Sequence, residues 1–320
     1  MNELLADVQV LRPRVDGEGV YFFQKWFCEA WEAAGGAVLE ERIKLPWRVK
    51  QIIGRLRLCF SIGSHRKKLL ITASGRMDSV AWPWCYFYEL VPVLWDVWPF
   101  QIPHLIRFVR RNRVRLLFCT SSQVVDKINC QVKDCHAVWM PEGIKCEEYP
   151  AGMPLKDRSV DILEYGRRKK DVHESLLSHD FGSAIKHVYP TASRLVEPNA
   201  EAFRALLRDA KIVVCYPQCD TNPQRAGEIE TLTQRYWECM LSGALIVGRA
   251  PEELIRLCGY NPVVSLSASP ADDIGSMLTH INDFQALVDR NRTTALKLGD
   301  LSCRVQDMSK TFGNYSGRRR

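Results

Sequence analysis

The sequence predicts an α/β protein with two Rossmann-like domains that face a cleft, and three observations carry this prediction. Short apolar runs rich in β-branched and aromatic residues alternate with stretches of helical periodicity, which is the pattern of a parallel sheet covered by helices. A segment rich in proline and glycine at 141–157 interrupts this alternation, which then restarts. The 320 residues, of which 46% are hydrophobic, suffice for two packed cores.

The first domain is expected at residues 1–152. Its opening predicts a strand, a loop at 16–19 and a helix that stops at Gly35-Gly36. The remaining strands of this half are short branched or aromatic runs separated by helical or turn segments. The predicted strands are 8–12, 37–40, 68–73, 91–95, 115–119 and 137–140, and the predicted helix is 21–34.

The second domain is expected at residues 153–320, where the same alternation resumes. Its predicted strands are 160–165, 184–189, 212–215 and 244–247, and its predicted helices are 169–177 and one that begins near Gln234. Two such halves joined by a hinge bind a ligand between them, outside the carboxyl ends of their strands.

Two glutamates, Glu230 and Glu238, stand with seven residues between them in a loop–helix–strand segment, ETLTQRYWECMLSGALIVG. We expect Glu238 in the first turn of this helix. A helix N-terminus offers free N–H groups and a positive dipole end to phosphate, and a carboxylate accepts hydrogen bonds from hydroxyls. The segment therefore suits a nucleoside diphosphate joined to a sugar. The alternative is an acidic first turn favoured only by the helix dipole.

This segment resembles the sugar-donor signature of retaining GT-B glycosyltransferases of the group-1 type. The resemblance implies that Glu230 faces the donor sugar and that Glu238 holds the ribose hydroxyls. Thr231, Leu232 and Thr233 stand where that family usually has an aromatic–glycine pair. The resemblance places these three residues beside the bound nucleotide sugar. Arg235 has no fixed counterpart in the family pattern, but it lies in the loop beside any bound diphosphate.

A second feature is a glycine turn followed by four cations, Gly166-Arg167-Arg168-Lys169-Lys170, at the end of the predicted strand 160–165. Phosphate favours close backbone approach at glycine and a neighbouring arginine. Gly166, Arg167 and Arg168 are therefore candidates for binding the diphosphate, as the resemblance also implies. The alternative is a surface charge run. Arg225, in the long loop at 216–227, is a further phosphate candidate.

The expected reaction needs neither a metal nor another cofactor, because cations and a helix N-terminus would stabilise the leaving diphosphate. In retaining members of the family, the phosphate itself takes the acceptor proton. An inverting enzyme would need a base from the first domain, for which Asp16, Asp96 and His104 are the candidates.

A basic stretch at 42–76 contains ten Lys or Arg residues and no Asp or Glu, although the whole chain carries only +7. A basic amphipathic helix at 47–60 would suit an anionic membrane surface. The resemblance implies a glycan or lipid-linked acceptor. A helix packed on the sheet is the alternative. Nucleic acid is not an expected partner, because no nucleic-acid-binding motif accompanies the basic runs.

Other hypotheses about the function remain open. Gly17-x-Gly19, with Glu40 some twenty residues later, is a two-glycine version of the dinucleotide-binding motif and would suit an NAD(P)-dependent oxidoreductase. A non-catalytic protein that binds nucleotide sugar would share the fold, and a non-catalytic nucleic-acid-binding protein is a further alternative. Twelve cysteines without a CxxC pair, no long apolar run and no signal-peptide pattern predict a cytoplasmic protein, and the basic stretch adds peripheral contact with the inner membrane face as an option.

Overall fold

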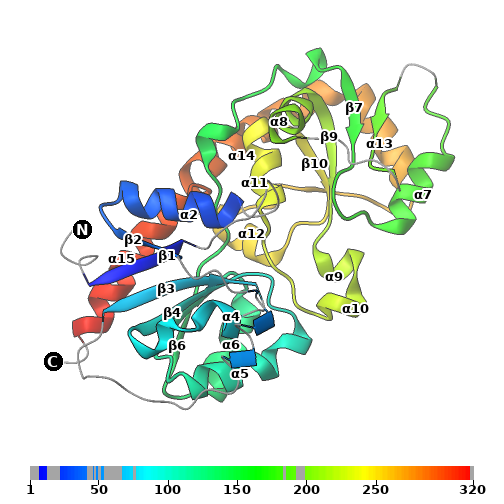
Figure 1. The fold of residues 1–320 in the computed structure, drawn as a ribbon. Helices are drawn as coiled ribbons and strands as arrows, with labels where there is room; N and C mark the ends of the chain where they lie inside the picture. Colours follow the sequence, from blue (N-terminus) through cyan, green and yellow to red (C-terminus); the bar gives the residue numbers. More distant parts are fainter. Residues whose placement is uncertain are drawn as a thin grey trace. The chain divides into compact units, whose positions relative to one another are not determined.

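The computed structural model describes residues 7–12, 22–41, 46, 48–49, 52–53, 67–74, 77–182, 185–191 and 199–317. The chain divides into two compact units (Figure 1). The first combines Met1–Glu142 with Leu301–Arg320, and the second is Gly143–Asp300.

The first unit contains a sheet of six parallel strands in the order β2-β1-β3-β4-β5-β6. The strands are β1 (Val8–Arg12), β2 (Ala37–Glu40), β3 (Lys68–Ala73), β4 (Glu89–Leu94), β5 (Leu116–Cys119) and β6 (His136–Trp139). Their bounds agree with the predicted strands to within two residues. Nearly all residues of β3, β4 and β5 are buried, because helices cover both faces of a parallel sheet. This burial explains why these segments are almost continuously apolar.

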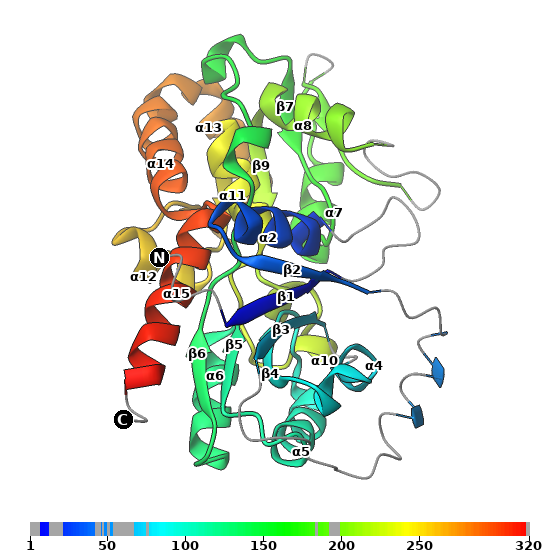
Figure 2. The ribbon, with the colours of Figure 1, turned by 60° about the vertical axis from the view of Figure 1, so that its left-hand side comes forward.

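Helices cover both faces of this sheet. They are α2 (Phe22–Ala33), α4 (Met77–Ala81), α5 (Ile102–Arg111), α6 (Ser122–Gln131) and α15 (Leu301–Gly317), with short helical turns η1 (Trp84–Tyr86) and η2 (Pro99–Gln101). Figure 2 shows α2 and α15 together on one face and α4, α5 and α6 on the other.

The helix α15 changes the expected domain boundary, because the predicted second domain ran to residue 320. It packs against α2, and the ring of Phe312 lies 5.8 Å from that of Phe118 in β5. An amphipathic pattern reveals that a helix has a buried face, but it does not reveal which sheet receives that face.

The second unit contains five parallel strands in the order β11-β10-β9-β7-β8. The strands are β7 (Val160–Leu163), β8 (His187–Val188), β9 (Ala210–Cys215), β10 (Leu245–Gly248) and β11 (Val264–Ser265). The longer helices are α7 (Lys170–Ser178), α8 (Ala200–Asp209), α11 (Gln234–Ser242), α12 (Glu252–Cys258), α13 (Pro270–Thr279) and α14 (Gln285–Leu298). The short ones are α9 (Gln218–Thr221), α10 (Pro223–Ala226), η3 (Cys146–Glu148), η4 (Leu155–Asp157) and η5 (Ile281–Phe284).

The core of the second unit follows the two-residue period of its strands. In β9, Ile212 and Val214 join the apolar cluster beneath α7, α13 and α14, whereas Cys215 faces α11, with its Sγ 3.8 Å from that of Cys239. Trp237 of α11 is completely buried. The helix ends at Gly243, which takes the left-handed conformation (φ 70°) that favours glycine.

The strand order places the direction change of this sheet between β7 and β9. The chain passes from β7 to β8 on one side and then returns to add β9 on the other side. Crevices outside the carboxyl ends of the strands at such a position bind ligands in open α/β sheets. The carboxyl ends of β7 and β9 are therefore where a site is expected. None of the helices that the structure describes is long and apolar enough to cross a bilayer.

Candidate functional site

Three strands of the second unit deliver the candidate residues to one edge of the sheet. Glu164 to Arg168 follow β7, Tyr216 follows β9, and Arg249 follows β10. Lys169 lies over the ring of Tyr216 at 5.3 Å, so the loops after β7 and β9 are in contact. The site is therefore built at the direction change of the sheet.

The turn at Gly166 favours glycine. Its φ is +66°, and a Cβ on this residue would lie 2.2 Å from Nη2 of Arg235. Arg235 Nη1 donates to the carbonyl oxygen of Arg167 at 3.1 Å, and its guanidinium lies 5.1 Å from the ring of Tyr165. Arg235, predicted to lie beside the diphosphate, thus also braces the glycine turn.

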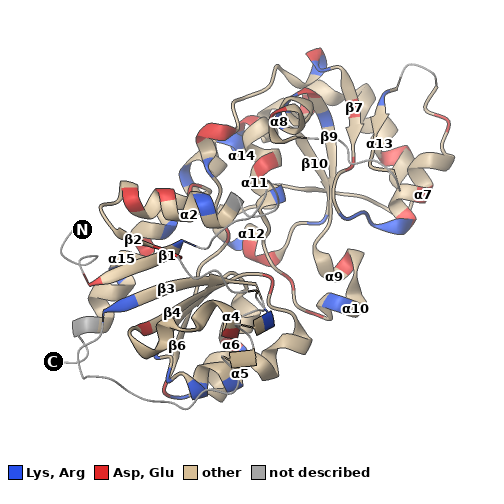
Figure 3. Cartoon of the chain, in the orientation of Figure 1, with Lys and Arg blue, Asp and Glu red and all other residues tan. Residues whose placement is uncertain are grey.

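The four cations that follow Gly166 differ in their surroundings. Arg167 is exposed, whereas Arg168 is half-buried with Nη1 2.7 Å from Nε2 of His173. Lys169 pairs with Asp171, and Lys170 pairs with Glu174 on the surface of α7. Figure 3 shows the cations as a blue stretch that leads into α7. The two arginines therefore remain the candidates for binding phosphate.

Glu238 lies just past the first turn of α11, the turn in which it was predicted to lie. The helix begins at Gln234 after the extended N-cap Thr233, so Glu238 is its fifth residue. Tyr149 Oη donates to Oε1 at 3.0 Å, and Tyr165 Oη donates to Oε2 at 2.9 Å. Burial raises the pKa of Glu238 above its usual value, and the two tyrosine hydrogen bonds oppose that rise.

Glu230 belongs to a second charged group at the same edge. Arg249 Nη1 donates to Glu230 Oε1 at 2.7 Å, and Nε and Nη2 of Arg249 donate to the two carboxylate oxygens of Asp220 at 2.5 and 2.9 Å. The hydrogen bonds to Asp220 raise the pKa of Arg249. Sequence reasoning missed Asp220 and Arg249. The sequence did contain a signal for Arg249, because this cation directly follows the strand that comes after the two-glutamate segment.

The loop before α11 is largely occupied by internal contacts. Thr231 and Leu232 are buried, and the Leu232 amide donates to Glu253 Oε2 at 2.8 Å. The hydroxyl of Thr233 does not cap the helix. Arg225 is exposed in α10. The Leu232 amide is thus committed to a carboxylate, contrary to the expectation of free amides along this loop.

A buried carboxylate between two histidines was also missed. Glu164, directly after β7, is only 1% exposed. Its Oε2 lies 2.6 Å from Nδ1 of His173 and 3.0 Å from Nε2 of His187. Burial raises the pKa of Glu164, but hydrogen bonds from His187 and His173 outweigh it, and the net pKa is lowered. The three ligand-type atoms lie within 4.8 Å of one another.

In the first unit, His104 is partnered with a buried carboxylate. Its Nε2 lies 3.1 Å from Oδ2 of Asp78, which is 2% exposed and also contacts Arg111. Asp78 comes after β3 and His104 after β4, and Asp96, with φ 51°, stands two residues after the end of β4. These residues lie at the carboxyl edge of the first sheet. Asp16, the Gly17-x-Gly19 loop and most of the basic stretch 42–76 lie outside the described residues.

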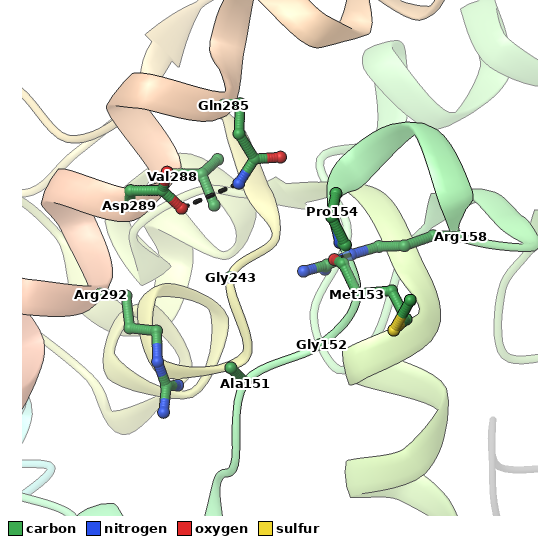
Figure 4. Close-up of a pocket in the computed structure, with 10 residues that line it drawn as sticks. All are labelled: Ala151, Gly152, Met153, Pro154, Arg158, Gly243, Gln285, Val288, Asp289 and Arg292. Carbon is green, nitrogen blue, oxygen red and sulfur yellow. Dashed lines mark hydrogen bonds between the residues drawn. The ribbon is translucent and has the colours of Figure 1, made fainter.

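A cavity of about 280 Å³ in the second unit contains none of the predicted site residues (Figure 4). Arg158 lines it and donates to the carbonyl oxygens of Met153, Ala210 and Ser242 at 2.7, 2.8 and 3.1 Å. Burial lowers the pKa of Arg158 to about 10. Its guanidinium therefore joins the ends of α8 and α11, which is a structural role.

No protein-family model and no curated protein matches this chain. Solved structures do. The chain is similar to Anabaena HepE, determined in complex with UDP, with a TM-score of 0.61 and 10% identity over 96% of this chain and 99% of that one. The chain is also similar to a putative UDP-N-acetylglucosamine 2-epimerase from Listeria monocytogenes, with a TM-score of 0.57 and 10% identity over 97% of this chain and 96% of that one. For AviGT4, a glycosyltransferase involved in avilamycin A biosynthesis, the TM-score is 0.55 and the identity is 12% over 96% of this chain and 97% of that one. These similarities extend over both units and confirm the predicted GT-B fold.

Proposed function

We propose that this chain is a glycosyltransferase that moves a sugar from a nucleoside-diphosphate sugar to a hydroxyl acceptor. One observation carries the proposal: Tyr165 joins the two halves of the predicted sugar-donor site. It directly precedes the Gly166–Arg168 turn, and its hydroxyl donates to Glu238, 73 positions away, at 2.9 Å. A cationic turn and a carboxylate that accepts hydrogen bonds thus meet at the edge where α/β sheets bind nucleotides.

The chemistry of these groups fits a nucleotide sugar. Arg167 and Arg168 can each donate several hydrogen bonds to phosphate oxygens. Each oxygen of Glu238 accepts one tyrosine hydrogen bond and has a second lone pair for a ribose hydroxyl. The N-terminus of α11 adds a positive dipole end near Thr233.

In the mechanism we propose, Arg167, Arg168 and this helix end stabilise the charge that develops on the leaving diphosphate, without a metal. Glu230 faces the donor sugar in an orientation set by Arg249. The sugar is transferred with retention, and the phosphate takes the acceptor proton. For inversion, His104 would be the base, with the carboxylate of Asp78 3.1 Å from its Nε2.

The proposed acceptor is a glycan or a lipid-linked sugar, and the proposed location is the cytoplasm. The basic composition of 42–76 supports contact with an anionic membrane surface. Nucleic acid is not a proposed partner. Because HepE was determined with UDP, a uridine nucleotide is the first sugar-donor class to test.

The test begins with a thermal-shift screen against UDP, GDP, ADP, their sugars, NAD(H) and NADP(H), with and without magnesium. We expect one nucleoside diphosphate and its sugars to raise the unfolding temperature. Stabilisation by a nicotinamide cofactor alone would favour the oxidoreductase instead. The sugar nucleotide that binds is then incubated with acceptor glycans, and both products are measured. A glycosylated acceptor formed in equal amount with the nucleoside diphosphate supports transfer.

Epimerisation is the second candidate, because the similarity to the putative 2-epimerase is of the same order as that to AviGT4. A 2-epimerase changes the configuration of its sugar without an acceptor. Appearance of the 2-epimer when only UDP-N-acetylglucosamine is supplied would replace the proposed transfer with this reaction.

A further inference from the structure

We propose that His173 is a positioning residue for Arg168, and that Glu164 fixes the imidazole proton that makes this possible. The inference rests on the proposed function, because it assigns Arg168 to the diphosphate. It adds a pair of residues that act behind the cationic turn: Glu164 at the end of β7 and His173 in the first turn of α7.

The hydrogen-bond chemistry determines where the proton lies. Arg168 Nη1 is 2.7 Å from His173 Nε2, and a guanidinium can only donate. His173 Nε2 must therefore accept, which leaves the proton of the neutral ring on Nδ1. That nitrogen lies 2.6 Å from Glu164 Oε2 and donates to it. The order Glu164–His173–Arg168 is thus consistent in every donor and acceptor.

The same reasoning separates this cluster from a metal site. Glu164, His173 and His187 are residue types that bind zinc. A metal on His173 would have to take Nδ1, the nitrogen that faces Glu164. The remaining proton would then move to Nε2 and point at the Arg168 guanidinium, 2.7 Å away. The contact with Arg168 therefore favours a hydrogen-bond relay over metal ligation.

A neutral acceptor has a specific advantage beneath a phosphate-binding arginine. Across the described residues, no carboxylate lies within ion-pair distance of Arg168, whose other neighbour is the ring of Tyr189 at 5.9 Å. A carboxylate in direct contact would orient the guanidinium but also neutralise it. The imidazole orients the guanidinium, keeps Glu164 one ring width away, and leaves the remaining N–H groups for an anion.

Packing holds the imidazole in this orientation. Tyr189 contacts both histidines, with its ring 5.1 Å from that of His173 and 4.8 Å from that of His187. His187 Nε2 gives Glu164 a second hydrogen bond at 3.0 Å. Because Glu164 is buried and bonded twice, it cannot move without breaking these contacts.

Two substitutions at one position separate the relay from simple packing. His173→Gln places an amide oxygen near the position of Nε2, where it can accept from Arg168. His173→Asn places its amide near the position of Nδ1, where it can still donate to Glu164 but cannot reach Arg168. UDP, GDP and ADP are titrated into wild type, H173Q, H173N, R168A and R168A/H173N by calorimetry, with the corresponding nucleosides as controls that lack phosphate.

For the diphosphate that binds wild type, we expect H173N to weaken binding about tenfold, as loss of a charge-assisted hydrogen bond would. H173Q should stay within about threefold of wild type. In the R168A background, H173N should have no further effect, because the residue through which it acts is gone. Nucleoside binding should not change in any variant.

Equal losses in H173Q and H173N, or full additivity with R168A, would overturn the inference while leaving the proposed function intact. If none of the three diphosphates binds wild type, the proposed function fails and the inference fails with it. Nitrogen-15 NMR of the wild-type imidazoles gives a readout that does not depend on a folded variant. We expect His173 to carry its proton on Nδ1 at neutral pH, and a proton on Nε2 would contradict the relay.

Discussion

Two arginines at the same edge of one sheet are held in opposite ways. Arg168, after β7, is oriented by a neutral histidine and has no carboxylate within ion-pair distance among the described residues. Arg249, after β10, donates to both carboxylate oxygens of Asp220 and to Glu230. The contrast teaches that position at a sheet edge does not assign a role to a cation. Its acceptors decide whether its charge remains available for a ligand.

Arg249 is well placed to act as a brace. Gly248, just before it, has φ 122°, and a Cβ there would lie 2.3 Å from the carbonyl oxygen of Cys215. Through Asp220 and Glu230, Arg249 joins α9 and the loop before α11 to the end of β10. Its charge is compensated by those two carboxylates, so we assign it to orienting Glu230 and not to binding phosphate.

The largest expected effect comes from removing the available cation. Arg168→Ala should lower kcat/KM for transfer about a hundredfold, because one preorganised hydrogen-bond donor to a developing anion contributes on this scale. The free energy of unfolding should stay close to that of wild type. The matched control is Lys170→Ala, which removes a neighbouring cation that pairs with Glu174 on the surface. Equal kinetics of R168A and K170A would contradict the contrast.

Removing the brace should instead affect stability. Arg249→Ala leaves the carboxylates of Asp220 and Glu230 without their shared partner, and we expect a loss of about 2 kcal/mol in the free energy of unfolding measured in urea. Lys310→Ala breaks an exposed ion pair with Asp307 and should cost much less. An unchanged midpoint for R249A, with a selective loss of diphosphate affinity, would instead make Arg249 a phosphate ligand.

A smaller effect is expected at the carboxylate next to the cationic turn. Glu238→Ala should weaken binding of the nucleoside diphosphate about tenfold through lost ribose hydrogen bonds. The 2′,3′-dideoxy nucleotide should bind wild type and E238A equally, because it lacks the hydroxyls in question. Glu201→Ala, an exposed glutamate of α8, is the control. If E238A also bound the dideoxy nucleotide about tenfold more weakly than wild type, Glu238 would not act through the ribose hydroxyls.

The smallest effect concerns pH. The folded-state pKa of Glu164 is lowered, since the bonds from His187 and His173 outweigh burial. Its ionised form therefore contributes stability that is fully present above the ordinary carboxyl pKa of about 4.3 and is lost as pH falls through the lower folded value. In urea unfolding at a series of acidic pH values, Glu164→Gln should show a shallower acid-side loss than wild type. Identical slopes would place the acid transition elsewhere.

The sequence predicted the fold well because parallel strands covered on both faces leave a strong local signal. Apolar runs such as 68–73 and 115–119 gave this signal. The proline- and glycine-rich segment at 141–157 marked where the first half ends and the second begins. The signal was weaker for β8, which has only two residues. The final helix returned to the first unit through contacts with α2 and Phe118, and such long-range packing has no local pattern.

The site was predicted only where its residues are close in sequence. Gly166 to Arg168 form one turn, and the sequence predicted correctly that this turn follows a strand. The relay joins Glu164 to His173 and His187, which requires knowing that β7 pairs with β8. The Arg249 group joins residues up to 29 positions apart across two strand ends. The start of α11 at Gln234 agrees with the prediction, but Glu238, as the fifth residue, lies just past the first turn in which it was expected.

The most direct test of the account is where a nucleoside diphosphate protects the backbone from hydrogen exchange. Wild-type protein is compared with and without the diphosphate chosen by the screen. We predict slower exchange in peptides that cover 164–170 and 231–239, at the edge formed by β7 and the start of α11. Protection confined to 151–158 and 285–292, which line the cavity around Arg158, would contradict the account. So would an exchange pattern that the nucleotide does not change.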